Sequence, residues 1–303
     1  MPYIKTKDTR FGEEPVSIFV EDLHDSTVSP SAGTSSKPTL LFIHGWPLSH
    51  EMWENQTVYF AEQGYRCVSY DRRGFGKSSK PFGGYDYDTM ADDLKAVIDE
   101  LNLDNVILIG FSMGGGEIAR YFSRHGGAKV VKAVLVSAIT PFLLKTSDNP
   151  DGVDQSVFDG MLEGMQKDRY DFLQTFAKSF YGVNLVSHPV SQAHLDRDFM
   201  LASLASPKAT LECAKAFAST DFRDEMRTIN VPTLIIHGDA DQTVPLESSG
   251  EKAHELLPQA DYKVYDGEPH GLFVTAKDGL NADLLEFVQQ RVHQNQSVPS
   301  TTY

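Results

Sequence analysis

Short, continuous apolar runs recur along this chain, and helical patterns lie between several of them. A strand that is covered on both faces is typically a run of this kind, and strands that alternate with helices form a mainly parallel sheet. The runs are Thr39–Ile43, Tyr65–Tyr70, Val106–Ile109, Ala133–Ala138, Thr233–Ile236 and the weaker Tyr262–Tyr265. Two short strands, Tyr3–Lys7 and Val16–Glu21, are expected before them. The sequence therefore predicts an α/β fold with a mainly parallel central sheet flanked by helices.

The helical spacing is clearest just after position 90. Apolar residues three and four positions apart fall on one face of a helix. The apolar set is Ala91, Leu94, Val97, Ile98 and Leu101. The same spacing assigns Asp92, Asp93, Lys95, Asp99 and Glu100 to the solvent face. A closing helix is expected over Leu280–Val292.

The alternation of strands and helices stops between residues 142 and 220. This interval is rich in Phe and Met at helical spacing and holds no convincing strand, so we expect a helical cap inserted between two strands of the sheet. The predicted core domain is then in two parts, 1–141 and 221–293, followed by a flexible tail over 294–303. Residues 25–37 are rich in Ser, Thr, Pro and Gly, and we expect an exposed, mobile loop there.

The charge and amino-acid composition of the chain argue against two classes of binding partner, nucleic acids and membranes. The 303 residues include 42 acidic and 27 basic side chains, a formal net charge of −15. Such a surface repels phosphate backbones and anionic lipids, so neither nucleic acid nor a membrane is expected as a partner. No apolar run approaches the roughly 18 residues of a membrane span, and the first residues do not resemble a signal peptide. Cys67 and Cys213 are too few for a disulfide framework. We expect a cytoplasmic enzyme or small-molecule binder, and a homo-oligomer is compatible with the sequence.

One serine stands out because of its position between a strand and a helix. Gly110-Phe-Ser-Met-Gly114 follows an apolar run and precedes a helical segment. A G-x-S-x-G motif in this setting is typical of a nucleophile elbow. The sharp turn holds the serine in a strained backbone conformation, and side chains larger than glycine at Gly110 and Gly114 would clash. The motif predicts Ser112 as a nucleophile at the carboxyl edge of the sheet, where ligands of parallel sheets bind.

A serine hydroxyl needs a base, and a histidine is expected late in the chain. His254 lies in a helical pattern and His293 near the tail, so both are interpreted as surface residues. His237 ends a strand and is interpreted as a packed strand residue. His270 lies in a loop after the last strand, between Pro269 and Gly271. An imidazole presented by a rigid loop at the edge of the sheet suits a general base, so His270 is the predicted base.

An acid is needed to orient the imidazole. Asp239 and Asp241 both follow the Thr233–Ile236 run. Asp241 lies further out and is better placed to reach a neighbouring loop, whereas Asp239 is better placed to accept a hydrogen bond from the turn backbone. The sequence favours Asp241 and keeps Asp239 as the alternative.

Attack by a serine creates an oxyanion, which needs backbone N–H donors. One donor is expected from Met113, the residue after the nucleophile. The second should come from the loop after the Thr39–Ile43 run. In that loop Pro47 has no N–H, so the N–H of Trp46 is the available donor.

Seven motifs together resemble those of one known family. They are His44–Ser49, Tyr70–Ser78, Gly84–Asp88, Gly110–Glu117, Thr220–Phe222, His237–Gln242 and Pro269–Gly271. The chain resembles the cofactor-free (non-haem) haloperoxidases, which are α/β-hydrolases related to bacterial aryl esterases. This resemblance implies the α/β-hydrolase fold, a triad of Ser112, Asp241 and His270, and no haem, flavin or metal cofactor. It also implies an oxyanion hole formed by Trp46 and Met113.

The resemblance also implies a substrate pocket, formed by Pro47 and by positions that match the family's acyl pocket. These positions are Ile139, Phe142, Phe158, Phe176 and Phe180. In haloperoxidase-like members, a proline after the tryptophan accompanies perhydrolysis, in which hydrogen peroxide replaces water as the acyl acceptor. Asn184–Asp196 matches no pattern of the family.

The predicted function is hydrolysis of short acyl or aryl esters, and of lactones, through an acyl-enzyme, with a perhydrolase or metal-free haloperoxidase side activity. A small-molecule ester is the expected partner. Haloalkane dehalogenases and epoxide hydrolases need an aspartate at position 112, so serine there argues against both. A carbon–carbon bond or lactam hydrolase with the same triad stays open, as does a hydrolase-fold receptor for a small molecule.

Overall fold

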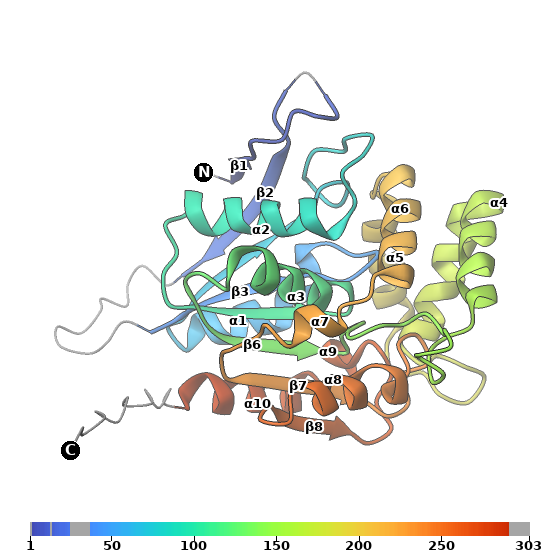
Figure 1. Cartoon of the computed structure of the whole chain (residues 1–303). Helices are drawn as coiled ribbons and strands as arrows, with labels where there is room; N and C mark the ends of the chain where they lie inside the picture. Colours follow the sequence, from blue (N-terminus) through green and yellow to red (C-terminus); the bar gives the residue numbers. More distant parts are fainter. Residues whose placement is uncertain (1, 13, 25–36, 291–303) are drawn as a thin grey trace, which may run out of the picture.

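Eight strands form one sheet within the described residues, in the order β1-β2-β4-β3-β5-β6-β7-β8 (Figure 1). The computed structural model describes residues 2–12, 14–24 and 37–290. The strands are β1 (Tyr3–Lys5), β2 (Ser17–Leu23), β3 (Thr39–Ile43), β4 (Arg66–Tyr70), β5 (Val106–Phe111), β6 (Val130–Val136), β7 (Thr233–Gly238) and β8 (Asp261–Tyr265). The mobile loop predicted over 25–37 (except its last residue), the tail predicted over 294–303 and His293 lie outside the described residues.

The sheet is mainly parallel, as predicted. Neighbouring strands are parallel from β4 across to β8, and β1 and β2 add an antiparallel edge. Every residue of β3, β5 and β7 is buried, as expected for strands covered on both faces. The run predicted over Ala133–Ala138 is shifted towards the N-terminus. β6 ends at Val136 because Ser137 has a φ of 43°, which is outside the extended region.

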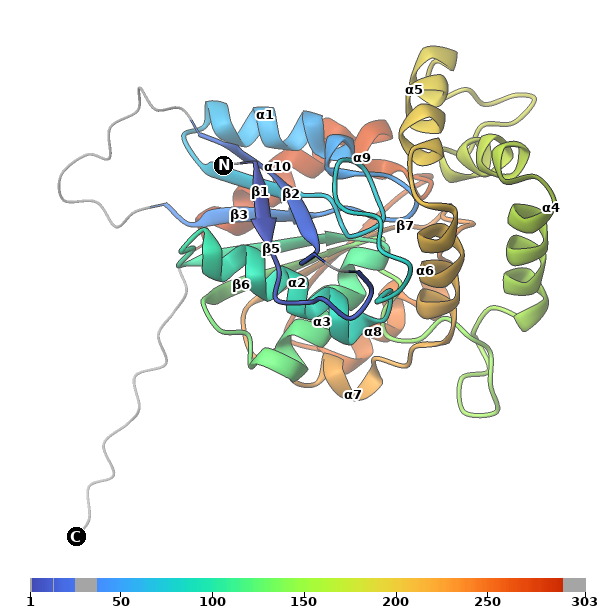
Figure 2. The same ribbon diagram turned by 90° about the horizontal axis from the view of Figure 1, so that it is seen from above.

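Helices cover both faces of the sheet (Figure 2). Two buried apolar clusters lie on opposite faces, with α2, α3 and α8 contributing to one and α1, α9 and α10 to the other. These helices are α1 (Glu54–Glu62), α2 (Tyr87–Glu100), α3 (Met113–His125), α8 (Gly250–Leu256), α9 (Leu272–Thr275) and α10 (Lys277–Gln289), with short 3-10 turns η1 (His50–Trp53) and η2 (Leu246–Ser248). Neighbouring residues of one strand belong to different clusters, for example Leu40 and Leu41.

Two helix predictions need correction. The closing helix, predicted over Leu280–Val292, begins three residues earlier, at Lys277, and ends at Gln289, and residues 291 and 292 of the prediction lie outside the described residues. Its first turn is polar, so apolar spacing could not reveal it. In α2, Asp93 is buried rather than on the solvent face, because it receives two hydrogen bonds from the buried guanidinium of Arg73 at 2.6 and 2.7 Å. Burial raises the pKa of Asp93 to about 6, although Arg73 acts in the opposite direction.

The segment between β6 and β7 forms helices that stand together to one side of the sheet (Figures 1 and 2). They are α4 (Gln155–Phe180), α5 (Gln192–Ser203) and α6 (Pro207–Ser219), and the short α7 (Arg223–Met226) follows. α4 is kinked at Asp168, whose side chain accepts from the N–H groups of Tyr170 and Asp171. The helices α4, α5 and α6 fall within 142–220, the segment predicted as the cap.

Both cysteines are buried and unbonded. Burial raises the pKa of each thiol, Cys67 and Cys213, to about 12. None of the helices within the described ranges is both long and apolar enough to cross a membrane.

Candidate active site

Ser112 lies at a sharp turn between β5 and α3, with a φ of 52°. The two glycines of the motif are required by close approach rather than by their own φ values. A Cβ on Gly110 would lie 2.7 Å from the Gly114 carbonyl oxygen, and one on Gly114 would lie 2.8 Å from the Ile43 carbonyl oxygen. The Ser112 carbonyl accepts from the N–H groups of Gly115 and Ile139. The backbone therefore has the geometry expected for a nucleophile elbow.

The close packing at Gly114 predicts a loss of stability in the Gly114→Ala variant. The new methyl group would press on the backbone of β3, so we expect the free energy of unfolding to fall by about 1–3 kcal/mol. Urea denaturation measures this change. Gly160→Ala is the matched control, because Gly160 lies in α4 with open space around it. That variant should be about 0.5–1 kcal/mol more stable than the wild type. Equal effects at the two positions would contradict the packing argument.

His270 reaches Ser112 from the loop after β8. Its Nε2 lies 3.0 Å from the Ser112 Oγ, and its ring packs against those of Phe111 and Phe180, with centroid distances of 4.7 and 4.8 Å. Only 1% of His270 is exposed. The Gly271 N–H donates to the Phe180 carbonyl, so the cap holds the loop in place. His254, predicted at the surface, is half-buried on α8.

Asp241 lies behind the imidazole. Its Oδ2 is 2.6 Å from the His270 Nδ1, and its Oδ1 accepts from the N–H groups of Thr243 and Val244. Burial alone would raise the pKa of Asp241, but His270 and His237 favour the charged form more strongly and lower the pKa well below its ordinary value. The alternative acid, Asp239, instead accepts from the Gly267 N–H at 2.7 Å.

His237 lies closer to this group than the sequence indicates. It is fully buried in β7, as predicted for a packed strand residue, and its Nε2 contacts the Val244 carbonyl at 2.8 Å. The same Nε2 lies 3.4 Å from the Asp241 Oδ2. His237 and Asp241 are four residues apart, a spacing that brings side chains together in a helix but not across a strand and the turn after it. No local pattern could therefore have predicted this contact.

The two residues predicted to supply oxyanion donors, Met113 and Trp46, lie at the start of α3 and in the loop after β3. Met113 is the first residue of α3, so its N–H has no acceptor within the helix. Trp46 lies in the loop after β3. This loop packs directly against the elbow, since a Cβ on Gly45 would lie 2.5 Å from the Phe111 ring and 3.1 Å from the Ser112 Cβ. The Trp46 indole packs beneath the cap and donates to the Thr210 carbonyl at 3.1 Å.

A small apolar cavity of about 20 Å³, room for about one water molecule, lies between the loop after β3 and the cap. Its lining residues are Pro47, Leu48, Leu173, Phe176, Ala177, Phe180, Tyr181, Asp198, Phe199 and Ala202. Three of them, Pro47, Phe176 and Phe180, are predicted pocket residues. Leu173 and Ala177 share the helical spacing of those two phenylalanines, a signal that could have added them to the prediction.

The other three predicted pocket residues lie outside the lining of this cavity. The Ile139 N–H donates to the Ser112 carbonyl at 3.2 Å, so Ile139 supports the elbow. The Phe142 ring packs under the Arg223 guanidinium, whose Cζ lies 5.2 Å from the ring centroid. Phe158 belongs to the apolar cluster on the side of α2 and α3.

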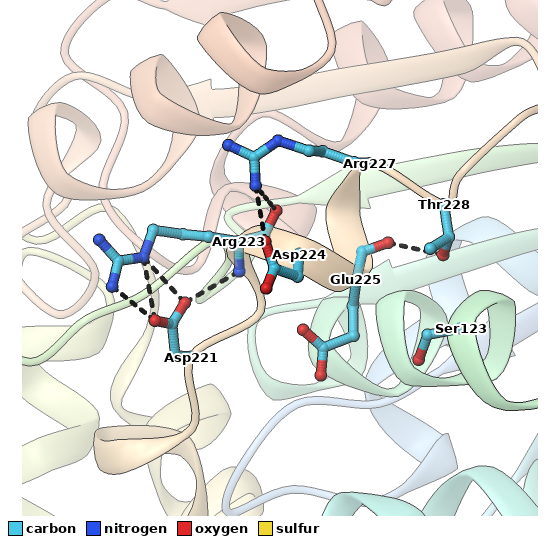
Figure 3. A pocket seen from close by; sticks show the side chains of 7 residues that line it. All are labelled: Ser123, Asp221, Arg223, Asp224, Glu225, Arg227 and Thr228. Atoms are coloured by element: carbon cyan, nitrogen blue, oxygen red, sulfur yellow. Dashed lines mark hydrogen bonds and ion pairs between the residues drawn. The ribbon is translucent and has the colours of Figure 1, made fainter.

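A larger hollow of about 770 Å³ lies elsewhere, around α7 (Figure 3). Its lining residues are Ser123, Asp221, Arg223, Asp224, Glu225, Arg227 and Thr228. Figure 3 shows Arg223 and Arg227 paired with the neighbouring carboxylates of Asp221 and Asp224. Ser123 lies eleven residues along α3 from Ser112, roughly 16 Å at the rise of an α-helix. The hollow is therefore separate from the Ser112 site.

The structure thus brings together a hydroxyl, an imidazole and a carboxylate from three separate loops. An imidazole that contacts a serine on one side and a carboxylate on the other can remove the serine proton and return it to a leaving group. Within the described part of the chain, no group of three or more His, Cys, Asp or Glu side chains is arranged to hold a metal ion.

Comparison with known proteins gives matches over most of the chain. The family described as alpha/beta hydrolase fold matches residues 38–277. The chain is 43% identical over 256 residues to a non-heme haloperoxidase of Rhodococcus erythropolis, which covers 84% of this chain and 93% of that protein. It is 38% identical over 290 residues to a bifunctional esterase/perhydrolase of Acinetobacter calcoaceticus, with 95% and 100% covered. The crystal structure of a bromoperoxidase from Bacillus anthracis has a TM-score of 0.87 at 41% identity, over 95% of this chain and 99% of that chain.

Proposed function

Since this chain belongs to the α/β-hydrolase family, among the non-haem haloperoxidases and their esterase relatives, we propose that it hydrolyses carboxylic esters with Ser112 as nucleophile. The observation that carries this proposal is the pair of contacts made by one imidazole. His270 lies 3.0 Å from the Ser112 Oγ and 2.6 Å from the Asp241 Oδ2.

The proposed reaction has two halves. His270 Nε2 takes the proton of Ser112 as the Oγ attacks the ester carbonyl, and the N–H groups of Met113 and Trp46 stabilise the oxyanion. The tetrahedral intermediate collapses, and the alcohol leaves with the proton from His270. Water then attacks the acyl-enzyme with His270 again acting as base, the bond between the acyl carbon and the Ser112 Oγ breaks, and His270 returns the proton to Oγ as the carboxylic acid leaves. Asp241 stabilises the imidazolium formed in each half, and its lowered pKa keeps it ionised for this role.

We propose short acyl or aryl esters as substrates. The rings of Phe111 and Phe180 pack against the His270 ring, with centroid distances of 4.7 and 4.8 Å, so the surroundings of the triad are apolar and suit a compact apolar group. The test is hydrolysis of p-nitrophenyl esters of graded chain length. We expect kcat/KM to be highest for acetate to butyrate and to fall for longer chains. A preference for long acyl chains would contradict the proposed substrate class.

Labelling by a fluorophosphonate separates this proposal from a small-molecule receptor with the same fold. A working hydrolase should be labelled at Ser112, and the Ser112→Ala variant should not. An unlabelled wild-type protein would support the receptor. Labelling without turnover of any ester would support a carbon–carbon bond or lactam hydrolase that uses the same triad.

The presence of Pro47 indicates that hydrogen peroxide can serve as a second acyl acceptor. It sets where the Trp46 carbonyl points, and we propose that this carbonyl accepts a hydrogen bond from hydrogen peroxide during attack on the acyl-enzyme. With acetic acid and hydrogen peroxide, the products are then peracetic acid and water. Peracid is measured by its oxidation of bromide. In Pro47→Ala the ratio of peracid formation to ester hydrolysis should fall about fivefold, the effect of one hydrogen bond of about 1 kcal/mol. An unchanged ratio, or a wild type that forms no peracid, contradicts the role of Pro47.

A further inference from the structure

A buried ion pair lies beside the elbow and takes no part in the proton transfers proposed above. Arg72 is 1% exposed and Glu117 is fully buried. The Arg72 Nε donates to the Glu117 Oε1 at 2.5 Å, and the Tyr70 hydroxyl donates to the Glu117 Oε2 at 2.5 Å. Removing two charges from water is costly, so the position of this pair calls for an explanation.

Arg72 contacts the oxyanion loop at its first residue, His44. The Arg72 Nη2 donates to the His44 carbonyl at 2.7 Å, and the Arg72 backbone N–H donates to the His44 Nε2 at 2.9 Å. Because Nε2 accepts, the imidazole proton lies on Nδ1. Burial and the charge of Arg72 lower the pKa of His44 to about 3, which keeps this ring neutral.

The His44 ring in turn holds one peptide group of the loop. Its Nδ1 lies 2.8 Å from the Gly45 carbonyl oxygen and donates to it, and the Leu48 N–H donates to the same oxygen at 3.2 Å. The Gly45 carbonyl and the Trp46 N–H belong to the same planar peptide group, in which they point in opposite directions. Holding the carbonyl therefore sets the direction of the N–H that is proposed as an oxyanion donor.

The other end of the ion pair lies on the helix that carries the second donor. Glu117 is four residues after Met113 in α3, one turn along the same face. Arg72 thus connects the Met113 side of the oxyanion hole with the Trp46 side. We infer that Arg72 and Glu117, acting through His44, are positioning residues that hold the two oxyanion donors at a fixed separation. This inference rests on the proposed function.

The test compares two buried ion pairs of this chain. The double variant Arg72→Met/Glu117→Gln removes the guanidinium and leaves no unpaired charge. In Glu117→Gln alone, the amide oxygen can still accept the hydrogen bond from Arg72. Arg73→Met/Asp93→Asn is the matched control, because Arg73 is equally buried and pairs with Asp93 on α2 rather than with the oxyanion loop. Each variant is assayed for kcat and KM on p-nitrophenyl acetate and for inhibition by a trifluoromethyl ketone, which forms a tetrahedral adduct with serine.

We expect kcat to fall about 10- to 100-fold in Arg72→Met/Glu117→Gln, somewhat less than the loss of a whole oxyanion donor. KM should stay within about threefold, and the inhibition constant of the ketone should rise by the same factor as kcat falls, because both depend on the oxyanion. The Arg73 control should keep kcat within about threefold of the wild type. Glu117→Gln should lower kcat by less than the double variant, because the amide still accepts from Arg72 but leaves its charge without a counter-charge. If the Arg72 double variant does not fold, Arg72→Lys should show the same linked changes, since lysine lacks the second donor that reaches His44.

The inference is overturned if folded Arg72 variants keep kcat within about threefold, if the Arg73 control loses as much activity, or if the ketone binds unchanged. Failure of the proposed function looks different. A wild type without ester hydrolysis that depends on Ser112 overturns the proposed function, and this inference with it, before any Arg72 variant is compared.

Discussion

The Ser112→Ala variant should hydrolyse p-nitrophenyl acetate with a kcat on the order of 10⁶-fold below that of the wild type, the scale seen when a serine hydrolase loses its nucleophile. The physical reason is that no other hydroxyl occupies the position 3.0 Å from the His270 Nε2 in the described site. The backbone donors and the apolar surroundings remain, so slow hydrolysis above the rate in water should persist. Single-turnover measurements should show no burst of p-nitrophenol.

Ser137→Ala is the matched control for this variant. Ser137 is also buried, also follows a strand of the sheet and also has a positive φ, of 43°. The same substitution there should leave kcat within about threefold, because the Ser137 hydroxyl, although it lies on the neighbouring strand beside the elbow, has no hydrogen-bond partner among the described residues. Comparable activity losses at the two serines would show that Ser112→Ala acts through the backbone turn rather than through loss of the nucleophile.

The Asp241→Asn variant should lower kcat by about 10⁴-fold with little change in KM. An asparagine amide can donate to the His270 Nδ1, which would then carry no proton and would leave the proton on Nε2, facing Ser112. The imidazole could no longer act as a base. The variant should also react slowly with a fluorophosphonate, which provides a second measurement that does not depend on the choice of ester.

Asp239→Asn is the control for the acid. Asp239 accepts from the Gly267 N–H, and an asparagine carbonyl can do the same, so kcat should stay within about threefold. A loss of about 10⁴-fold in Asp239→Asn, with Asp241→Asn active, would move the acid to Asp239. This outcome would require the loops after β7 and β8 to rearrange from the structure described above.

Much of the fold could be predicted because its signals are local. A strand covered on both faces must be apolar at every position, and this property can be read from a few consecutive residues, as at Thr39–Ile43. The elbow motif can also be read locally, since a Cβ on Gly110 would meet the carbonyl of Gly114 four residues later, although Gly114 itself is required by Ile43 of the adjacent strand β3. The helices of the cap could be expected from spacing, and the spacing in α4 indicates its cavity-lining face, but nothing local indicates that residues of α5 line the same cavity.

Sequence-based predictions were wrong where the burial of a side chain depends on a partner that is distant in the sequence. Helical spacing assigned Asp93 to solvent, but Arg73 supplies a buried counter-charge from another loop. Arg72 and Glu117 belong to two of the motifs that resemble the family, but nothing in their local pattern indicates that they contact each other and that Arg72 contacts His44. An ion pair between residues far apart in sequence has no periodicity to detect.

Local patterns were enough to establish an alternating α/β chain, the strained serine turn and the loop histidine, because each depends on neighbours within a few positions. The choice between the carboxylates of Asp239 and Asp241 needed the folded sheet. Both follow β7, and what separates them is the direction of the turn: one side chain faces the backbone at Gly267 and the other faces the imidazole of His270. Distances between the loops of neighbouring strands arise from packing, which brings together groups that the chain itself keeps far apart.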